Sequence, residues 1–364
     1  MNDSRLTRRM FLRRAAAGGT GLVGLYLVGC GDGDSPAPSP TAPGAATATA
    51  APTPERPLVW RDITPSGIQP PARRDHSLVT DGERLYLFGG RNDGGDLPDL
   101  WAFDLASQSW SELAPTGPSP RHGHNAVWTP DSRMIVFGGQ AGGGFFNDLW
   151  AFDPAASAWA ELPGSGGGPE PRYGAGGSFD PEGRFLVTHG FTANGRFDDT
   201  WSYDLAGGAW SDISPADERP VERCLMRTVW DTLQARILIF GGQTNGTPFL
   251  DDLWSLQPGS TRGWARLERD PKPAPRAFYS MVFDGEANKM IIFGGNTQAG
   301  PANDLWFFDA KSEFWTSVVP GGLPPSPRQG HDAVWLPGRS SLVVFGGNSS
   351  DGDLNDLWEL ARAQ

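Results

Sequence analysis

The sequence predicts an all-β fold in which six similar units form the blades of a closed ring. Three observations predict it. A pattern of apolar run, Gly-Gly, polar segment and Asp-Leu-Trp, as in residues 342–358, recurs roughly every 50 residues. A second tryptophan follows most of these patterns about ten residues later. The 49 glycines and 33 prolines suit short strands separated by turns.

The repeated glycines and tryptophans delimit the units and indicate how the ring closes. The glycine pairs lie at residues 89–90, 138–139, 241–242, 294–295 and 346–347, and His189-Gly190 occupies the remaining position. The second tryptophan is missing after Trp358, whereas Trp60 lies upstream of the first glycine pair. We therefore expect the strand around Trp60 to complete the last blade, because this closure removes an open sheet edge.

The second unit shows the strands expected within each blade. Residues 124–128 form a short strand, residues 129–133 a turn, and residues 134–137 a continuous apolar strand that ends at Gly-Gly. A continuous apolar run is typical of a strand that is buried on both faces. A third strand at residues 149–152 and an outer strand at Trp159 complete the blade.

Four sequence marks in each unit resemble a known repeat. These are Pro-x-Arg-x-x-His, Phe-Gly-Gly, Asp-Leu-Trp-x-Phe-Asp and the following Trp, and they span residues 58–360. Together they resemble the kelch repeat of six-bladed propellers. The resemblance implies a six-bladed kelch-type β-propeller over residues 58–364, with ligands held at one face of the ring.

Residues 1–29 resemble an export signal of the twin-arginine type, with Arg8 and Arg9 before an apolar stretch. That stretch is shorter than the roughly 20 apolar residues of a membrane span. The signal ends in Leu27-Val-Gly-Cys30, which resembles a bacterial lipoprotein cleavage site with Cys30 as the lipidated residue. An uncleaved N-terminal anchor is the alternative, and both place the domain outside the cytoplasm.

Residues 30–57 form a predicted tether between the lipidated cysteine and the propeller. They are rich in Pro, Ala, Thr, Ser and Gly, a composition that does not bury enough apolar surface to fold. The formal net charge of −12 disfavours binding to nucleic acid or to anionic lipid. We therefore expect a monomeric lipoprotein of the bacterial cell envelope, periplasmic or at the cell surface, that contacts the membrane only through its anchor.

An arginine recurs at the start of the innermost strand of each unit. The series is Arg73, Arg121, Arg172, Arg223, Arg276 and Arg328. In kelch domains that bind substrates, arginines at this motif position can hold acidic ligands, so the resemblance makes these six residues candidate ligand-binding groups. The alternative is that each arginine pairs with an aspartate of its own or a neighbouring blade. The aspartate of Asp-Leu-Trp, which recurs in all six units, is expected to be structural.

The residue three positions after each arginine differs between units. Candidate ligand-binding residues at this position are His76, His124, Tyr279 and His331. The three histidines belong to adjacent blades of the closed ring, so a three-histidine metal site is conceivable. Histidine is also part of the ordinary kelch motif, and we expect neither a metal nor another cofactor.

The segments after Gly-Gly differ most between units, and we expect them to lie beside the arginines as loops. They are residues 91–98, 140–146, 191–197, 243–250, 296–302 and 348–354. Their polar side chains suit hydrogen bonding to sugars or peptides, and function is often found on loops above a rigid scaffold. The candidate ligand-binding residues here are Asn92, Gln140, Gln243, Asn296 and Asn348.

These features favour a binding module for protein or carbohydrate ligands over an enzyme, and they assign no catalytic residue. A periplasmic kelch-type enzyme that acts on a sugar acid, as an epimerase or mutarotase, is the alternative. A galactose-oxidase-like copper site is less compatible, because it needs tyrosines and a crosslinked cysteine that no motif brings together. After Cys30, only Cys224 remains, so no internal disulfide forms.

Overall fold

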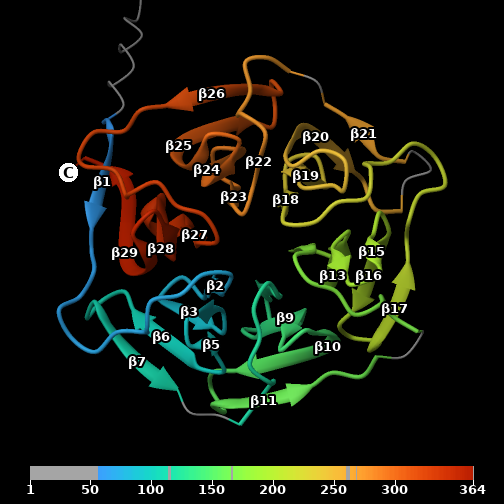
Figure 1. The fold of residues 1–364 in the computed structure, drawn as a ribbon, viewed down its shortest axis with the longest axis horizontal. Coiled ribbons are helices and arrows are strands. Elements are labelled where there is room, and N and C mark those ends of the chain that lie inside the picture. The colour runs from blue at the N-terminus through green and yellow to red at the C-terminus, as the bar shows by residue number, and fades with distance from the viewer. Residues whose placement is uncertain (1–55, 114–115, 165–166, 260–262, 268, 364) are drawn as a thin grey trace, which may run out of the picture. The chain divides into compact units, whose positions relative to one another are not determined.

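Six antiparallel sheets surround a central axis and follow one another around it in chain order (Figure 1). The structure is a computed structural model that describes residues 56–113, 116–164, 167–259, 263–267 and 269–363. The chain divides into two units, Met1–Thr53 and Pro54–Gln364, and the described residues belong to the second. The proposed signal with Arg8 and Arg9, and the lipidation residue Cys30, lie outside the described residues.

The first three blades each contain four strands, numbered here from the axis outward. Blade 1 consists of β2 (Ser77–Thr80), β3 (Arg84–Phe88), β6 (Leu100–Asp104) and β7 (Ser109–Leu113). Blade 2 consists of β8 (Asn125–Trp128), β9 (Met134–Ala141), β10 (Gly144–Asp153) and β11 (Ala158–Glu161). Blade 3 consists of β12 (Gly176–Phe179), β13 (Arg184–Thr188), β16 (Thr200–Asp204) and β17 (Ala209–Asp212).

The other three blades repeat this arrangement. Blade 4 consists of β18 (Arg227–Asp231), β19 (Arg236–Gly242), β20 (Leu250–Leu256) and β21 (Ala265–Arg266). Blade 5 has β22 (Arg276–Ala277) and β23 (Ser280–Asp284) beside β24 (Lys289–Thr297), then β25 (Gly300–Asp309) and β26 (Phe314–Val318). Blade 6 consists of β27 (Asp332–Leu336), β28 (Ser341–Ser349), β29 (Gly352–Arg362) and β1 (Leu58–Asp62).

The described residues contain one short helix, η1 (Pro337–Arg339), in a turn of blade 6. Across the same ranges, no helix is both long and apolar enough to cross a bilayer. The all-β, six-bladed prediction is therefore confirmed.

The ring closes through the N-terminal strand, as the tryptophan pattern predicts. Strand β1 pairs antiparallel with β29, and Trp60 lies opposite Leu360. The Trp60 side chain is buried, and its ring lies 5.0 Å from the ring of Phe293 in blade 5. Strand β1 therefore completes blade 6 and also packs against the neighbouring blade.

The second strand of each blade is apolar because neighbouring blades cover both of its faces. In β9, Val136 packs with Phe88 of blade 1, whereas Phe137 packs with Phe185 of blade 3. Successive side chains of a strand point to opposite faces, so one strand contributes to two interfaces. This position explains the continuous apolar run without alternation.

The glycine pair after this strand forms a bulge rather than a break. Gly89 and Gly90 have φ values of +62° and +94°. A Cβ atom on Gly90 would lie 2.7 Å from the Cβ of His76, so the close approach of the innermost strand also requires glycine. The ladder shifts register here, as between Phe146 and Leu149 in β10, and pairing then resumes.

The predicted loops after Gly-Gly are therefore mostly hairpins, which corrects the sequence-based expectation. Pairing extends beyond the bulge in five blades: β4 (Arg91–Asn92) with β5 (Gly95–Asp96), β9 with β10, β14 (Phe191–Thr192) with β15 (Gly195–Arg196), β24 with β25, and β28 with β29. In blade 4, residues 243–249 form no such ladder. The hairpin tips are only two residues long, so they are held more rigidly than free loops.

Candidate functional site

The six motif arginines are buried and are paired within their own blades. Each has 0% or 1% of its surface exposed. Each guanidinium forms two hydrogen bonds of 2.6 to 2.9 Å with one aspartate of its blade. The pairs are Arg73–Asp99, Arg121–Asp148, Arg172–Asp199, Arg223–Asp252, Arg276–Asp304 and Arg328–Asp356. We call these six pairs, together with the tryptophans that bind the aspartates, the arginine–aspartate frame.

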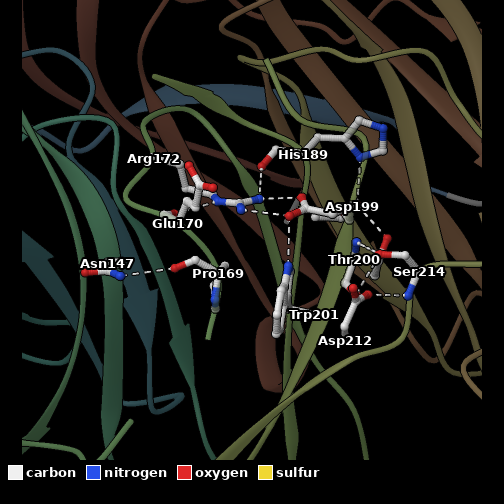
Figure 2. A network of polar contacts seen from close by, with 11 residues as sticks. Asn147, Pro169, Glu170, Arg172, His189, Asp199, Thr200, Trp201, Asp212 and Ser214 are labelled. Atoms are coloured by element: carbon white, nitrogen blue, oxygen red, sulfur yellow. Dashed lines mark hydrogen bonds and ion pairs between the residues drawn. The ribbon is translucent and has the colours of Figure 1, made fainter. Parts of the chain in front are cut away.

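Blade 3 shows the hydrogen bonds of one frame unit (Figure 2). The terminal nitrogens of Arg172 donate to Asp199 at 2.6 and 2.9 Å, and Nη1 also donates to the carbonyl oxygen of His189 at 2.8 Å. The Nε–H of Arg172 donates to the Glu170 carbonyl, and the Trp201 indole donates to Asp199 Oδ2 at 2.8 Å. All three guanidinium nitrogens are therefore engaged within the protein.

The frame also determines the ionisation of its carboxylates. Burial by itself raises the pKa of Asp99, Asp199, Asp252 and Asp304, but the hydrogen bonds and charge of the paired arginine outweigh it and leave each pKa below its ordinary value. The four carboxylates therefore remain charged at neutral pH, and each arginine keeps its counter-ion.

This arrangement does not support the expected ring of ligand-binding arginines. The frame guanidinium groups are inaccessible to solvent, and a bidentate carboxylate already occupies each of them. A ligand would have to displace a bidentate aspartate from an arginine that is itself buried, which would break the ion pair of the frame. The aspartate of Asp-Leu-Trp is structural, as expected, and it binds the arginine and the indole of its own blade.

The side chains of the three motif histidines are buried between neighbouring blades, and each packs against a different blade. The rings of His76, His124 and His331 lie edge-on to Phe345, Phe88 and Phe293 of the preceding blade. His124 and His331 also hydrogen-bond to a serine hydroxyl of that blade, at 2.8 and 3.0 Å. Burial, with a smaller effect of nearby arginines, holds the pKa of each histidine well below its usual range.

Neither these histidines nor Tyr279 form a ligand site in the structure. Tyr279 is fully buried, and its hydroxyl donates to the carbonyl oxygen of Phe240 in blade 4. In the part of the chain that the structure describes, no three His, Cys, Asp or Glu side chains gather in a way that could hold a metal ion.

His189, which replaces a glycine in blade 3, is buried against blade 4, where its ring lies 6.1 Å from that of Trp264. In blade 1, a Cβ on Gly89 would lie 3.0 Å from Cε1 of His124 in blade 2. Blade 4 has Met226 at the corresponding position, so the imidazole of His189 occupies this interface. It is fully buried with φ of +60°, and burial lowers its pKa to about 3.

The innermost strand and the hairpins meet at one face, which we call the loop face. The residue after each frame arginine pairs through its backbone with a residue just beyond Gly-Gly, for example Arg74 with Arg91 and Gln329 with Asn348. The same pairing places Gln140, Gln243 and Asn296 around the axis. The prediction that these segments lie beside the arginine-bearing strand is confirmed. We call the rim formed by these paired residues the mouth.

A ring of backbone hydrogen bonds forms the floor of the mouth, and sequence reasoning missed it. Its members are Asp75, Gly123, Gly174, Leu225, Phe278 and Gly330. Each donates its N–H to the carbonyl of the member in the preceding blade, at 2.7 to 3.0 Å. All six have φ between +56° and +63°. The glycine two residues after the frame arginine in three units was the available sequence signal, since it favours this conformation.

The floor leaves little space on the axis beneath it. The cavity there measures about 40 Å³ and is lined by the floor together with His76, His124, Tyr173 and Arg227. A volume of this size accommodates water but not a sugar or a peptide side chain. On the loop face, the surfaces accessible to a ligand larger than water are therefore the floor, the mouth and the hairpins.

An ion pair and a hydrogen bond connect neighbouring blades around the mouth. Arg74 of blade 1 binds Asp353 of blade 6 at 2.6 Å, and His122 of blade 2 contacts Asp96 of blade 1 at 2.5 Å. Arg91 binds Asp75 within blade 1 at 2.9 Å. The polar candidates also make local contacts: Asn92 donates to the Ala72 carbonyl and Asn348 donates to Asp353.

Comparisons with known proteins agree with this geometry. A family model described as the KLHDC2/KLHL20/DRC7 Kelch-repeats domain matches residues 54–233 and 209–363. The Leucine-zipper-like transcriptional regulator 1 homolog of Drosophila melanogaster is 28% identical over 299 residues, which cover 76% of this chain and 29% of that protein. The human Rab9 effector protein with kelch motifs is 30% identical over 186 residues, 48% of this chain and 46% of that protein. Host cell factor 1 of Rattus norvegicus is 29% identical over 214 residues, 53% of this chain and 10% of that protein. The chain thus spans less than half the length of each of these relatives.

Proposed function

Since this chain belongs to the kelch-repeat family, we propose that it is a binding module that holds a protein ligand at the mouth and hairpins of its loop face. The observation that carries this proposal is the contrast between the frame and the hairpins. The frame is the same in every blade, and its guanidinium groups are buried and bonded to aspartates of the protein. The hairpins differ between blades and expose polar side chains. A rigid scaffold with variable, exposed tips is a typical arrangement for recognition.

The relatives support a protein ligand in particular. The name of the human relative, a Rab9 effector protein, describes a protein that acts together with another protein. A sugar-acid enzyme, the alternative considered above, would need accessible cationic groups for its substrate, whereas the frame arginines are buried and paired with aspartates. The proposal therefore assigns binding and no reaction to this chain.

The proposed location is the bacterial cell envelope. It rests on the sequence of residues 1–29, with Arg8 and Arg9 as the export signal and Cys30 as the lipidated residue. The propeller would then be a monomer attached by residues 30–57 and presented to envelope proteins. A Cys30→Ala variant, expressed in a host that processes lipoproteins, should lose membrane partitioning and keep its fold. Continued firm membrane attachment of this variant would instead indicate an uncleaved anchor.

The binding proposal is tested by replacing hairpin tips that do not contribute to blade contacts. Residues 93–94 and 350–351 are exchanged for Gly-Ser, and the matched control exchanges the exposed turn 130–132 on the opposite face. Envelope proteins captured by the wild-type propeller are identified, and a purified candidate is titrated against all three proteins. Loss of affinity in the tip variant alone supports the proposal.

A control that loses affinity while the tip variant retains it would place the ligand on the opposite face. A glycan array probed with the same proteins provides a second arm. Specific binding of glycans, without any protein ligand, would replace the protein in this proposal by a carbohydrate.

A further inference from the structure

The hairpins of blades 2 and 3 differ from those of the other blades because they carry aromatic rings. Phe145 of blade 2 and Phe191 of blade 3 lie partly exposed on the loop face, with ring centroids 5.8 Å apart and an interplanar angle of 73°. The corresponding hairpins of blades 1, 5 and 6 carry no aromatic side chain, and Phe249 of blade 4 lies in a segment that forms no hairpin. Aromatic residues contribute strongly to binding when they lie in the centre of an interface.

Arg196 lies over the Phe191 ring of this pair and has no carboxylate partner among the described residues. Its guanidinium carbon is 5.3 Å from the centroid of Phe191. Its Nε–H donates to the sulfur of Cys224 at 3.3 Å, and Nη1 donates to Oδ1 of Asn245. Both partners are uncharged under neutral conditions, since burial raises the pKa of Cys224.

The two arginines of the mouth are already neutralised. Arg74 binds Asp353 at 2.6 Å and Arg91 binds Asp75 at 2.9 Å. Arg196, which contacts the mouth residues Phe191 and Cys224 from the hairpin, thus carries a charge that the described part of the protein leaves uncompensated. The contacts with Phe191, Cys224 and Asn245 fix the guanidinium plane, so little side-chain entropy remains to be lost on binding.

We propose that Arg196, Phe191 and Phe145 form a subsite for a carboxylate that is attached to an apolar group. The carboxylate binds the guanidinium by charge-assisted hydrogen bonds, and the apolar group packs against the two phenylalanine rings. In a protein ligand, this chemistry corresponds to an Asp or Glu side chain next to an apolar side chain. The inference rests on the proposed function, because it identifies which part of the loop face the ligand contacts and what the ligand presents there.

The overall charge of the protein makes this subsite selective. The chain has a formal net charge of −12, so an acidic ligand is repelled by most of the surface. An uncompensated guanidinium beside two aromatic rings is a local exception, and it fixes where an acidic ligand can bind. Binding should therefore weaken at high salt, because the attraction between partly exposed charges is screened.

The test uses small probes, so that it does not depend on finding the protein ligand. The wild-type propeller is titrated with 3-phenylpropionate, and with 3-phenylpropionamide as the uncharged probe of similar shape. NMR follows the Nε–H resonance of Arg196 and the backbone amides of the two aromatic hairpins. We expect saturable shifts at these positions with the carboxylate and affinity at least roughly tenfold weaker for the amide.

Two substitutions and one matched control locate the effect. Arg196→Gln removes the cation, and Asn245→Asp keeps Arg196 but supplies an internal carboxylate that competes with the probe. Both should weaken 3-phenylpropionate binding by roughly tenfold or more. Arg133→Gln, which removes an arginine paired with Asp131 in the turn on the opposite face, should leave the affinity within about twofold. Unchanged backbone spectra elsewhere show that the variants remain folded.

Equal binding of 3-phenylpropionate to wild type and Arg196→Gln would overturn the subsite, and so would equal binding of the carboxylate and the amide. Glucuronate, titrated in parallel, distinguishes the source of the carboxylate: tighter binding than 3-phenylpropionate would contradict a role for the phenylalanine rings. These results are independent of the capture experiment. Arg196-dependent probe binding without any protein ligand would overturn the proposed function alone, whereas protein binding unaffected by Arg196→Gln would overturn the subsite alone.

Discussion

The frame and the hairpins are both repeated around the ring. The residues of the frame are the same in every blade, whereas the residues of the hairpins change from blade to blade. Each frame unit has the same buried arginine, the same aspartate and the same indole donor. The hairpins that begin only a few residues further on vary from Asn-Asp-Gly-Gly in blade 1 to Gly-Gly-Gly-Phe in blade 2. A residue that recurs in every blade meets a demand of blade geometry, whereas recognition of one asymmetric ligand depends on the residues that differ.

The sequence left two interpretations of the recurring arginine: it binds a ligand, or it pairs with an aspartate of the propeller. The contacts in the structure decide between them. An exposed guanidinium would have been free for a ligand, but burial next to a carboxylate makes it part of the scaffold. Arg196 is not part of the repeat, and its side chain faces the mouth without a counter-ion among the described residues. The comparison therefore places stability in the frame and binding on the hairpins.

Removal of the closing strand should have the largest effect on stability. A propeller that begins at residue 63 lacks β1, so blade 6 loses its outer strand and the Trp60 side chain. The free energy of unfolding should fall by more than the value of about 3–5 kcal/mol that truncation of a buried tryptophan costs. Urea denaturation measures it, with Trp60→Phe as the milder companion variant. An unchanged melting temperature in the truncated protein would contradict closure through β1.

A single frame arginine should be the next most sensitive position. Arg223→Leu leaves Asp252 without its counter-ion and should lower the free energy of unfolding by about 3–5 kcal/mol. The double variant Arg223→Leu with Asp252→Leu removes the orphan charge, and it should recover part of the loss. Urea denaturation of the single and double variants makes the comparison. A loss below about 1 kcal/mol in the single variant would show that the frame is not the main scaffold.

Acid should destabilise the propeller before its carboxylates titrate. His76, His124 and His331 have pKa values in the folded state well below the usual value near 6.5, because they are buried. Their contribution to stability is full above about pH 6.5 and is lost as pH falls, since only the unfolded chain then gains protons. The expected slope is about 1.4 kcal/mol per pH unit for each such histidine.

Urea denaturation at pH 7 and pH 5.5 measures this slope. In the variant His331→Gln, the free energy of unfolding should depend less steeply on pH than in the wild type, because one fewer proton is taken up on unfolding. Equal stability of the wild type at both pH values would show that the histidines are not held neutral between the blades.

Exchange of hairpin tips should have the smallest effect on stability. Replacement of residues 193–194 or 350–351 by Gly-Ser should change the free energy of unfolding by no more than about 0.5 kcal/mol, because these exposed tips make few buried contacts. Chemical denaturation measures the stability of each variant, and titration with 3-phenylpropionate measures its affinity, so that effects on the scaffold and on binding are distinguished. A tip exchange that unfolds the protein would mean that the hairpins belong to the scaffold.

Most of the fold was predictable, because the repeat carries it. The period, the tryptophans and the apolar strands were enough to derive six blades and closure at Trp60. The hairpins were harder, because Gly-Gly is usually a sign that a strand ends. Here the two glycines form a bulge, and backbone pairing beyond it does not depend on an apolar pattern. The polar strands that follow therefore looked like loops.

The candidate site was less predictable, because its determinants are contacts between blades. The sequence does not reveal that Arg172 faces Asp199, or that Arg196 faces Cys224 and Asn245, since the partners are separated along the chain. The floor of the mouth is likewise a property of the backbone, and half of its members are not glycine. The repeat indicated the face of the ring on which ligand-binding residues should lie. Burial and pairing showed that Arg196, and none of the six frame arginines, is available to bind a ligand.

The measurement that tests the central claim most directly is the arginine Nε–H spectrum of the propeller, recorded with and without 3-phenylpropionate. Six frame resonances should exchange slowly with solvent and keep their positions when the probe is added, because their guanidinium groups are buried against aspartates. The Arg196 resonance should shift and saturate. A frame arginine that exchanges rapidly, or that shifts in place of Arg196, would contradict the division between scaffold and binding surface.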